Sequence, residues 1–253
     1  MDPSSIDEIA DGIYRISTCL PGVIAGRDIT VNSFLVMADE PLLFHTGMRS
    51  CFPAMAAALG RVLPVARLRW LSFGHVEADE CGAMNDLLAA APDLQVAFGA
   101  LGCHLSLDDM ADRPPRRLDP GEALDLGGRR VVVVDTPHVP HNIDAQVLYE
   151  ETTGTLLCGD LFTQLGPGPA VTGECLVEAA LDAEDVLNCS VPGEGVPQAL
   201  DRLADLEPQT LAIMHGSSYE GDGGRALREL AAAWRARLPT PTGERVAAGW
   251  LAG

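Results

Sequence analysis

Short apolar runs alternate with longer stretches of helical periodicity along most of the chain. Apolar runs of about four to eight residues are typical of buried strands, whereas apolar residues three or four positions apart indicate helices packed on a sheet. The pattern predicts strands at 12–17, 31–37, 42–45, 68–73, 94–98, 131–135, 146–150, 156–159 and 210–214. It predicts helices at 51–63, 80–90, 196–206 and 224–238. This alternation indicates one α/β domain over residues 1–253, with two α/β halves inside it as an alternative.

Two stretches of this pattern bear on where a site would lie. Apolar residues recur at helical spacing on one side of 80–90, which predicts a helix packed on a sheet. Asp79 stands at the N-cap position of that helix, so capping is one interpretation of it. Residues 166–181 begin with Gly-Pro-Gly-Pro and show no regular period, so we interpret them as an irregular segment that covers a site.

Composition narrows the possible partners. The formal net charge is −19 and none of the 17 basic residues is lysine, so a surface of this kind repels nucleic acids and anionic membranes. The seven cysteines are odd in number and never form a C-x-x-C pair, which argues against a disulfide framework or zinc ribbon. No basic leader and no apolar run of about 20 residues is present, so we expect a reducing, cytoplasmic location and no membrane span.

Three metal-capable side chains stand at alternate positions directly after the predicted strand 68–73. They are His75, Glu77 and Asp79, in the stretch Gly-His-Val-Glu-Ala-Asp-Glu. A zinc site rich in nitrogen ligands would more naturally carry a second histidine at position 77. The carboxylate there makes the site harder and more anionic, which favours iron or manganese.

Three further candidates follow other predicted strands. His141 comes shortly after 131–135, Asp160 closes 156–159, and His215 closes 210–214. Each of them taken singly has a simpler interpretation as a capping or solvent-facing residue. The carboxyl ends of strands in α/β sheets share one edge, however, where ligand crevices form. Together with the triplet they offer enough imidazoles and carboxylates for two metal ions about 3.5–4 Å apart, bridged by one carboxylate.

Four ordered motifs carry a family resemblance. They are His75-Val76-Glu77-Ala78-Asp79, His141-Asn142-Ile143-Asp144, Cys158-Gly159-Asp160-Leu161-Phe162 and Met214-His215-Gly216. With them the sequence resembles the metallo-β-lactamase superfamily and, within it, the diiron module of flavodiiron proteins. The stretches 45–49 and 136–141 are similar to those of stand-alone oxygen-binding diiron proteins, a group linked to bacterial oxygen sensing. The resemblance implies an αββα sandwich, in which two mixed sheets are flanked by helices and the metals lie at the edge between them.

The resemblance also implies a role for each motif residue. His75, Glu77 and His141 would bind a first iron, and Asp160 would bridge. Asp79 and His215 would bind a second iron.

Two positions depart from the family pattern. Flavodiiron proteins usually have histidine where this chain has Glu80, which could coordinate, bind a metal-bound water, or leave a position open. The superfamily often has aspartate where this chain has His45, and we expect His45 near the site but not on a metal. His138 is a candidate for lining the pocket or orienting a ligand. Tyr219 and Ser217 are candidate pocket donors.

The resemblance favours a non-haem diiron protein that binds, and slowly reduces, dioxygen or nitric oxide, in oxygen sensing or scavenging. The sequence contains no flavodoxin-like segment, so no flavin is expected in this chain and electrons would come from a redox or signalling partner. Flavodiiron relatives commonly form dimers, so a homodimer is expected.

Two alternatives stay open. The first is a dinuclear zinc or manganese hydrolase, which shares this fold and site. The second is a signalling module with a vestigial metal site. A catalytic nucleophile is not expected, because the chain has no G-x-S-x-G elbow.

Overall fold

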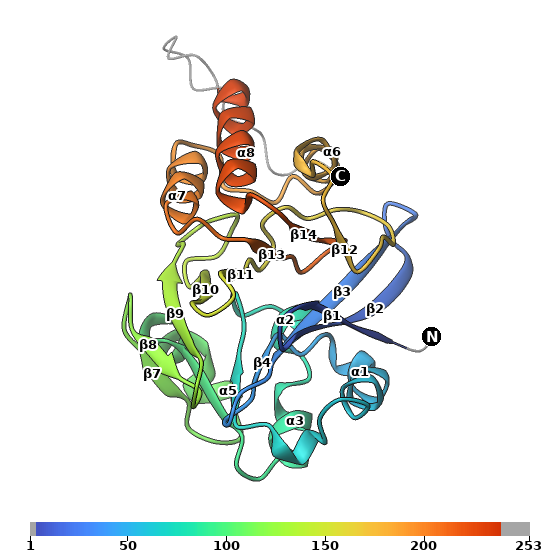
Figure 1. The fold of residues 1–253 in the computed structure, drawn as a ribbon, viewed down its shortest axis with the longest axis vertical. Coiled ribbons are helices and arrows are strands. Elements are labelled where there is room, and N and C mark those ends of the chain that lie inside the picture. The colour runs from blue at the N-terminus through green and yellow to red at the C-terminus, as the bar shows by residue number, and fades with distance from the viewer. Residues whose placement is uncertain (1–3, 239–253) are drawn as a thin grey trace, which may run out of the picture.

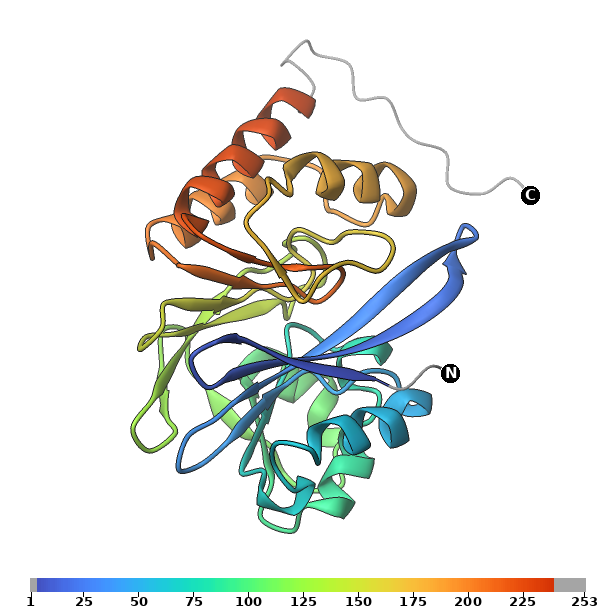
Figure 2. The same ribbon diagram turned by 45° about the vertical axis from the view of Figure 1, so that its right-hand side comes forward.

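The computed structural model describes residues 4–238, and within them the strands form two seven-stranded sheets. The sheets face each other, and helices cover the outer face of each (Figures 1 and 2). The chain crosses once from the first sheet to the second, between β7 and β8. The αββα sandwich predicted from the sequence is therefore confirmed.

The first sheet follows the order of the chain. Its strands are β1 (Ser5–Ala10), β2 (Ile13–Ile24), β3 (Arg27–Val36), β4 (Leu42–Phe44), β5 (Trp70–Ser72), β6 (Gln95–Gly99) and β7 (Arg116–Leu118). The outer segments are α1 (Phe52–Leu59), α2 (Ala78–Cys81), α3 (Met84–Ala90), α4 (Ala100–Gly102) and α5 (Asp108–Met110). Strands β1 to β4 pair antiparallel, whereas β4 to β7 pair parallel. Parallel pairing needs crossover connections, and the short helices supply them.

The second sheet has a rearranged order, β12-β14-β13-β11-β10-β9-β8. Its strands are β8 (Ala123–Asp125), β9 (Arg130–Asp135), β10 (Gln146–Glu150), β11 (Thr155–Leu157), β12 (Val171–Thr172), β13 (Thr210–Ala212) and β14 (Ser218–Glu220). The covering helices are α6 (Val177–Leu187), α7 (Gly195–Ala204) and α8 (Gly223–Arg237). Because β10 is antiparallel to both β9 and β11, and β11 is parallel to β13, the strands β9, β11 and β13 all end at the same edge.

Alternating side chains divide the core into layers. In β5, Trp70 lies in the cluster between the sheets, whereas Leu71 lies in the cluster under the helices of the first sheet. In β13, Ala212 joins the cluster between the sheets and Leu211 packs with residues of α7 and α8. This alternation follows from the two-residue period of a strand. It explains why the strands appear in the sequence as short, wholly apolar runs, because both of their faces are buried.

The nine predicted strands are all present, and β10 has the predicted bounds. The predictions for 42–45, 156–159 and 210–214 run too far, because their last residues form the turns that carry the site. Strands β1, β7, β8, β12 and β14 were not predicted, since most of them span only two or three residues.

The structure corrects one predicted helix and one predicted irregular segment. The helix predicted at 80–90 is divided into α2 and α3 by Gly82 and Ala83. A Cβ at Gly82 would collide with the Ala78 carbonyl oxygen and lie 3.0 Å from the backbone nitrogen of Arg49. An irregular covering segment was predicted at 166–181. This prediction is wrong for its last residues, because α6 begins at Val177 and buries Ala180 and Ala183.

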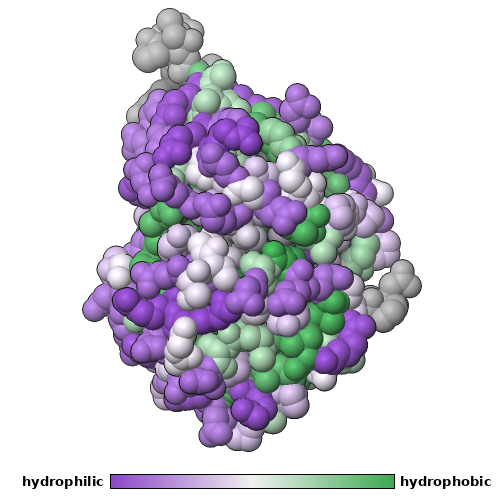
Figure 3. Space-filling model, in the orientation of Figure 1, coloured by the Kyte–Doolittle hydropathy of each residue, from purple (hydrophilic) through white to green (hydrophobic). Residues whose placement is uncertain are grey.

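The surface agrees with the acidic composition. The face in Figure 3 is largely hydrophilic, and its hydrophobic areas are separate patches. Within residues 4–238, no helix has both the length and the apolar character that crossing a bilayer requires.

Candidate metal centre

The loop after β5 presents the first group of candidate ligands. β5 ends at Ser72, and α2 starts at Ala78, so His75 and Glu77 lie in the turn between them. The Nε2 atom of His75 lies 2.8 Å from Oε2 of Glu77. Asp79 lies in the first turn of α2, where the N-cap position belongs to Glu77, so the interpretation of Asp79 as an N-cap is wrong.

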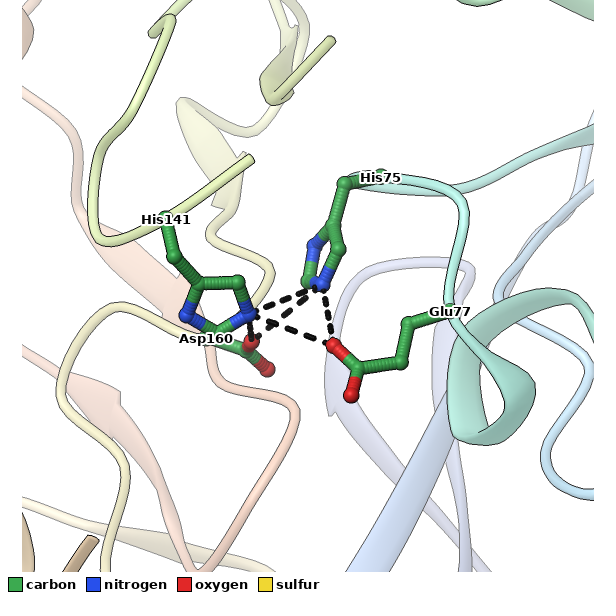
Figure 4. Close-up of side chains that lie close together, drawn as sticks. All are labelled: His75, Glu77, His141 and Asp160. Atoms are coloured by element: carbon green, nitrogen blue, oxygen red, sulfur yellow. Dashed lines mark hydrogen bonds and ion pairs between the residues drawn. The ribbon is translucent and has the colours of Figure 1, made fainter. Parts of the chain in front are cut away.

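The second sheet brings a histidine to the same point. His141 follows β9 through the Thr-Pro-His-Val-Pro turn, and its Nε2 lies 3.0 Å from Nε2 of His75 and 3.2 Å from Oε2 of Glu77. The two imidazole rings meet edge to face, with centroids 4.6 Å apart. Figure 4 shows His75 and Glu77 approaching from one side, and His141 and Asp160 from the other.

The carboxylate of Asp160 faces two positions at once. Its Oδ2 lies 3.3 Å from Nε2 of His141 and 3.8 Å from Nε2 of His75. Its Oδ1 lies 3.3 Å from Nε2 of His215, which is itself 3.4 Å from Oδ2 of Asp79. The six residues singled out from the sequence therefore converge on two adjacent positions, and Asp160 has one oxygen at each.

This donor set fits a pair of divalent cations. One ligand atom from each of His75, Glu77, His141 and Asp160 lies within 4.8 Å of the other three. Within the described residues, Oδ1 of Asp160 and Nδ1 of His141 are buried without a hydrogen-bond partner. Buried polar atoms without a hydrogen bond are costly, and a cation facing Oδ1, which has an ion pair with His215 but no hydrogen bond, would reduce the cost for that atom. Two imidazole nitrogens 3.0 Å apart are likewise typical of ligands that face one ion.

Without bound metal, the histidines of the site hold protons more tightly than free histidine does. Burial lowers the pKa of His75, but the carboxylates of Glu80 and Glu77 outweigh it and raise this pKa to about 12. Burial also opposes the protonation of His215, and Asp160 and Asp79 outweigh it and raise the pKa to about 10. Hydrogen bonds from His141 and His75 lower the pKa of Glu77 to about 2. The site therefore attracts positive charge strongly.

The side chain of Glu80 contacts His75 and His45. Its side chain is fully buried, and Oε2 accepts a hydrogen bond from the backbone N–H of His75 at 2.5 Å. Its Oε1 lies 3.2 Å from Nδ1 of His75 and 3.5 Å from Nε2 of His45. Glu80 could coordinate a metal, bind a metal-bound water, or leave a coordination position open. This geometry matches an open position at the second metal.

His45 lies behind the site, as expected from its place after β4. Its Nδ1 donates to the Asn32 carbonyl at 3.3 Å, and burial lowers its pKa against the opposing effect of Glu80. His45 thus contacts Glu80 mainly as a neutral ring. The two departures from the family pattern are therefore neighbours in space.

The other candidates lie apart from the two positions. His138 is exposed, and its backbone N–H donates to the Asn142 carbonyl at 2.7 Å, so a direct role for it stays a prediction. Tyr219 packs in the core with residues of α7 and α8. Ser217 is buried, and its backbone contacts the side chain of Gln164.

A cavity of about 170 Å³ opens on the site, and sequence reasoning missed half of the residues that line it. Beside five of the candidate ligands it is lined by Ile24, Ile29, Thr163, Leu187 and Cys189. Tyr219 and Ser217 are not among these lining residues. No signal in the sequence marked the walls, because they come from the hairpin of β2 and β3 and from the end of α6, which only the fold brings together.

Comparison with known families gives one match over most of the chain. The model described as "ODP family beta lactamase" matches residues 29–185.

Two curated proteins of different kinds are similar in sequence. Diflavin flavoprotein A 1 of Nostoc sp. is 27% identical over 192 residues, which cover 74% of this chain and 33% of that protein. Hydroxyacylglutathione hydrolase of Acidiphilium cryptum is 32% identical over 219 residues, covering 82% of this chain and 76% of that protein. The chain thus spans about a third of the length of the diflavin flavoproteins that it matches.

Among solved structures, the flavodiiron core of Flv1 from Synechocystis sp. superposes with a TM-score of 0.80 at 24% identity. The match covers 92% of this chain and 61% of that one. At this level of identity the likeness shows a shared fold.

Proposed function

Because the chain belongs to the ODP family of β-lactamase-type domains, in the flavodiiron-like branch of the metallo-β-lactamase superfamily, we propose that it is a diiron protein that binds dioxygen or nitric oxide. We propose slow reduction of the bound gas, and a role in oxygen sensing or scavenging, as its activity. The location we propose is the cytoplasm.

The observation that carries this proposal is the placement of Asp160. One of its oxygens faces the group of His75, Glu77 and His141, and the other faces His215 beside Asp79. A carboxylate placed in this way suits the bridge of a two-metal site. His75, Glu77 and His141 would hold the first ion, and Asp79 and His215 the second.

The carboxylates favour iron over zinc. Glu77, Asp79 and Asp160 offset three of the four positive charges on two ferrous ions, and oxygen ligands suit the harder ferric state. Glu80 acts on the site indirectly, through its ion pair with the ring of His75. Two iron ions would supply one electron each to a small oxidant. The residues of this chain hold the ions, shape the cavity and limit what enters it.

The cavity supports a small uncharged ligand. Ile24, Ile29 and Leu187 supply apolar walls beside the acidic donors. A volume of about 170 Å³ admits a diatomic gas easily, and is below the range of about 300–1,000 Å³ that is usual for drug-sized ligands.

Continuous turnover needs an electron donor, for which we propose a partner reductase or signalling protein. We also propose a homodimer, as is common among flavodiiron relatives. Rapid NADH-driven oxygen consumption by the protein alone would contradict the proposal of slow turnover.

Metal analysis of protein purified without oxygen tests the proposal. We expect about two iron ions per chain and an absorption spectrum that changes when air or nitric oxide is admitted. Protein that takes up only zinc under competing metals, with no spectral response to either gas, would contradict it.

A hydrolase remains the second candidate, because the relative of highest identity among those described above is a hydroxyacylglutathione hydrolase. In that case zinc or manganese would activate a water molecule against a thioester. Glu77 argues against it, since a carboxylate at this position makes a harder site than histidine does. Zinc-loaded protein that cleaves a hydroxyacyl-glutathione thioester, and iron-loaded protein that leaves the gases unbound, would favour the hydrolase.

A further inference from the structure

Glu80 is a buried carboxylate that contacts a candidate ligand from behind. We propose that Glu80 is a positioning residue for His75, and that its engagement there leaves the second metal position with three protein donors against four at the first. The inference deepens the proposed function and rests on it, because it takes His75 as a metal ligand.

The contacts of Glu80 define its function as an acceptor. Oε2 accepts from the backbone N–H of His75 at 2.5 Å, and Oε1 lies 3.2 Å from Nδ1 of the same residue. One carboxylate therefore bonds to the main chain of His75 and forms an ion pair with its ring, although Oε1 has no hydrogen-bond partner within the described residues. A negative charge beside Nδ1 favours a proton on that nitrogen, which leaves Nε2 to face Glu77 and His141, 2.8 and 3.0 Å away.

The fold makes room for this carboxylate. A Cβ at Gly74 would lie 2.9 Å from Oε1 of Glu80, so the glycine leaves the space that the carboxylate fills. The backbone carbonyl of Glu80 accepts from the N–H of Thr46 at 2.7 Å, which ties α2 to the end of β4. The ring of His45 closes the far side at 3.5 Å. Glu80 is thus held between His75 and His45, in the space beside Gly74.

The three histidines at the site are oriented by different partners. His75 has the carboxylate of Glu80, and His215 donates from Nδ1 to the Thr30 carbonyl at 2.7 Å. Within the described residues, Nδ1 of His141 has no hydrogen-bond partner. A charged acceptor makes an imidazole a stronger donor to metal than a carbonyl does. Glu80 therefore strengthens one ligand of the first position.

The two positions become unequal as a result. The first has His75, Glu77, His141 and one oxygen of Asp160. The second has Asp79, His215 and the other oxygen of Asp160. The second therefore keeps more coordination positions open, and it lies beside the cavity that Asp79 and His215 help to line. The incoming ligand is expected at this second position.

Ring nitrogen NMR of the wild-type chain tests the positioning of His75 directly, with Zn²⁺ as a diamagnetic probe. We expect a slowly exchanging, strongly downfield Nδ1 proton on His75 in metal-free and zinc-loaded protein, with Nε2 shifting when zinc is added. A His75 ring protonated at Nε2 with a free Nδ1 would overturn the proposal. If zinc leaves the ring unchanged, the proposal that His75 binds metal fails, and the metal-free Nδ1 signal still decides the contact with Glu80.

A matched pair of variants separates positioning from general damage. Glu80→Gln keeps the shape and removes the charge, whereas Asp144→Asn removes the charge of a carboxylate that accepts from the N–H of Val76, next to His75. We expect Glu80→Gln to weaken binding of the first Zn²⁺ about 10- to 100-fold and to shift the His75 Nδ1 proton upfield. We expect Asp144→Asn to leave both unchanged.

Two outcomes would overturn the inference. In the first, Glu80→Gln loses the second ion while the His75 ring signals stay as in the wild type, which would make Glu80 a direct ligand. In the second, the two variants weaken zinc binding equally, which would reduce Glu80 to support of the loop. Because zinc is the probe, neither outcome depends on iron or on gas binding.

Discussion

The two sheets supply their candidate ligands in different ways. The first sheet gives His75, Glu77 and Asp79 from a single turn after β5. The second sheet gives His141, Asp160 and His215 from the ends of three strands that are far apart in the sequence. One half of the site is thus a local motif, and the other half exists only because the second sheet folds. A two-metal site built in this way depends on the contact between the sheets.

The individual ligands also differ in how tightly they are held. The side chain of Glu77 is 52% exposed, whereas those of Asp160 and His215 are 11% and 7% exposed. The segment of His215 is bound to the first sheet, because the amide of Asn32 donates to the carbonyls of Ile213 and Gly216 at 2.9 Å. We expect Asp160 and His215 to be held rigidly, and Glu77 to be the more adaptable ligand.

The largest effect should come from Asp160, which both positions share. Asp160→Asn removes a carboxylate that faces both groups of candidate ligands, so we expect bound iron to fall from about two ions per chain to less than one. Metal analysis after anaerobic reconstitution measures this. Asp119→Asn, which removes an exposed carboxylate, is the control. A variant that keeps two ions would show that Asp160 is not a bridge.

The same contrast explains what could be predicted from the sequence. The triplet at 75–79 was visible from spacing alone, and the three strand-end residues followed from the rule that such ends share an edge. The direction of Glu80 was not predictable, because it depends on the space beside Gly74 and on the ring of His45. The cavity walls and the short edge strands were also missed. They are set by packing between distant segments, which leaves no periodic signal.

Removing one histidine from the second sheet should separate the two positions. His141→Ala and His215→Ala are each expected to lose about one ion, and Co²⁺ absorption should show that a different ion remains. In the metal-free protein, His215→Ala should lower the free energy of unfolding by about 2–3 kcal/mol, because it removes a buried ring and its bond to the Thr30 carbonyl. For His141, whose side chain is 20% exposed, we expect about 1 kcal/mol or less. Equal losses in chemical denaturation would contradict this dependence on the burial of the two rings.

The adaptable ligand of the first sheet should control the choice of metal. Glu77→His is expected to shift preference from iron toward zinc about tenfold or more, since it replaces an oxygen ligand by a nitrogen one. Glu77→Gln is the matched control, because it removes the charge but keeps an oxygen. Competition between Fe²⁺ and Zn²⁺ without oxygen measures the ratio. Unchanged iron retention in Glu77→His would remove Glu77 as the source of selectivity.

The smallest effect is expected from pH, and it separates the metal-free from the metal-loaded protein. The pKa values of His75 and His215 rise from 6.5 to about 12 and about 10 on folding without metal. Their contribution to stability is therefore complete below pH 6.5, and is lost as the pH rises through 10 and then 12. The pKa of Glu77 falls from 4.5 to about 2, so its contribution is present above pH 4.5 and lost as the pH falls through 2.

Metal-free protein should accordingly be most stable between about pH 4.5 and 6.5, and should melt at a lower temperature at pH 8.5. Bound metal needs the deprotonated rings, so its affinity rises over the same interval. The difference in melting temperature between zinc-loaded and metal-free protein should then widen by several degrees from pH 5.5 to 8.5, as scanning calorimetry at equal zinc excess would show. A constant difference would mean that the histidines do not exchange protons for metal. In that case the convergence of ligands from the two sheets would be a network of ion pairs, held together by its own charges.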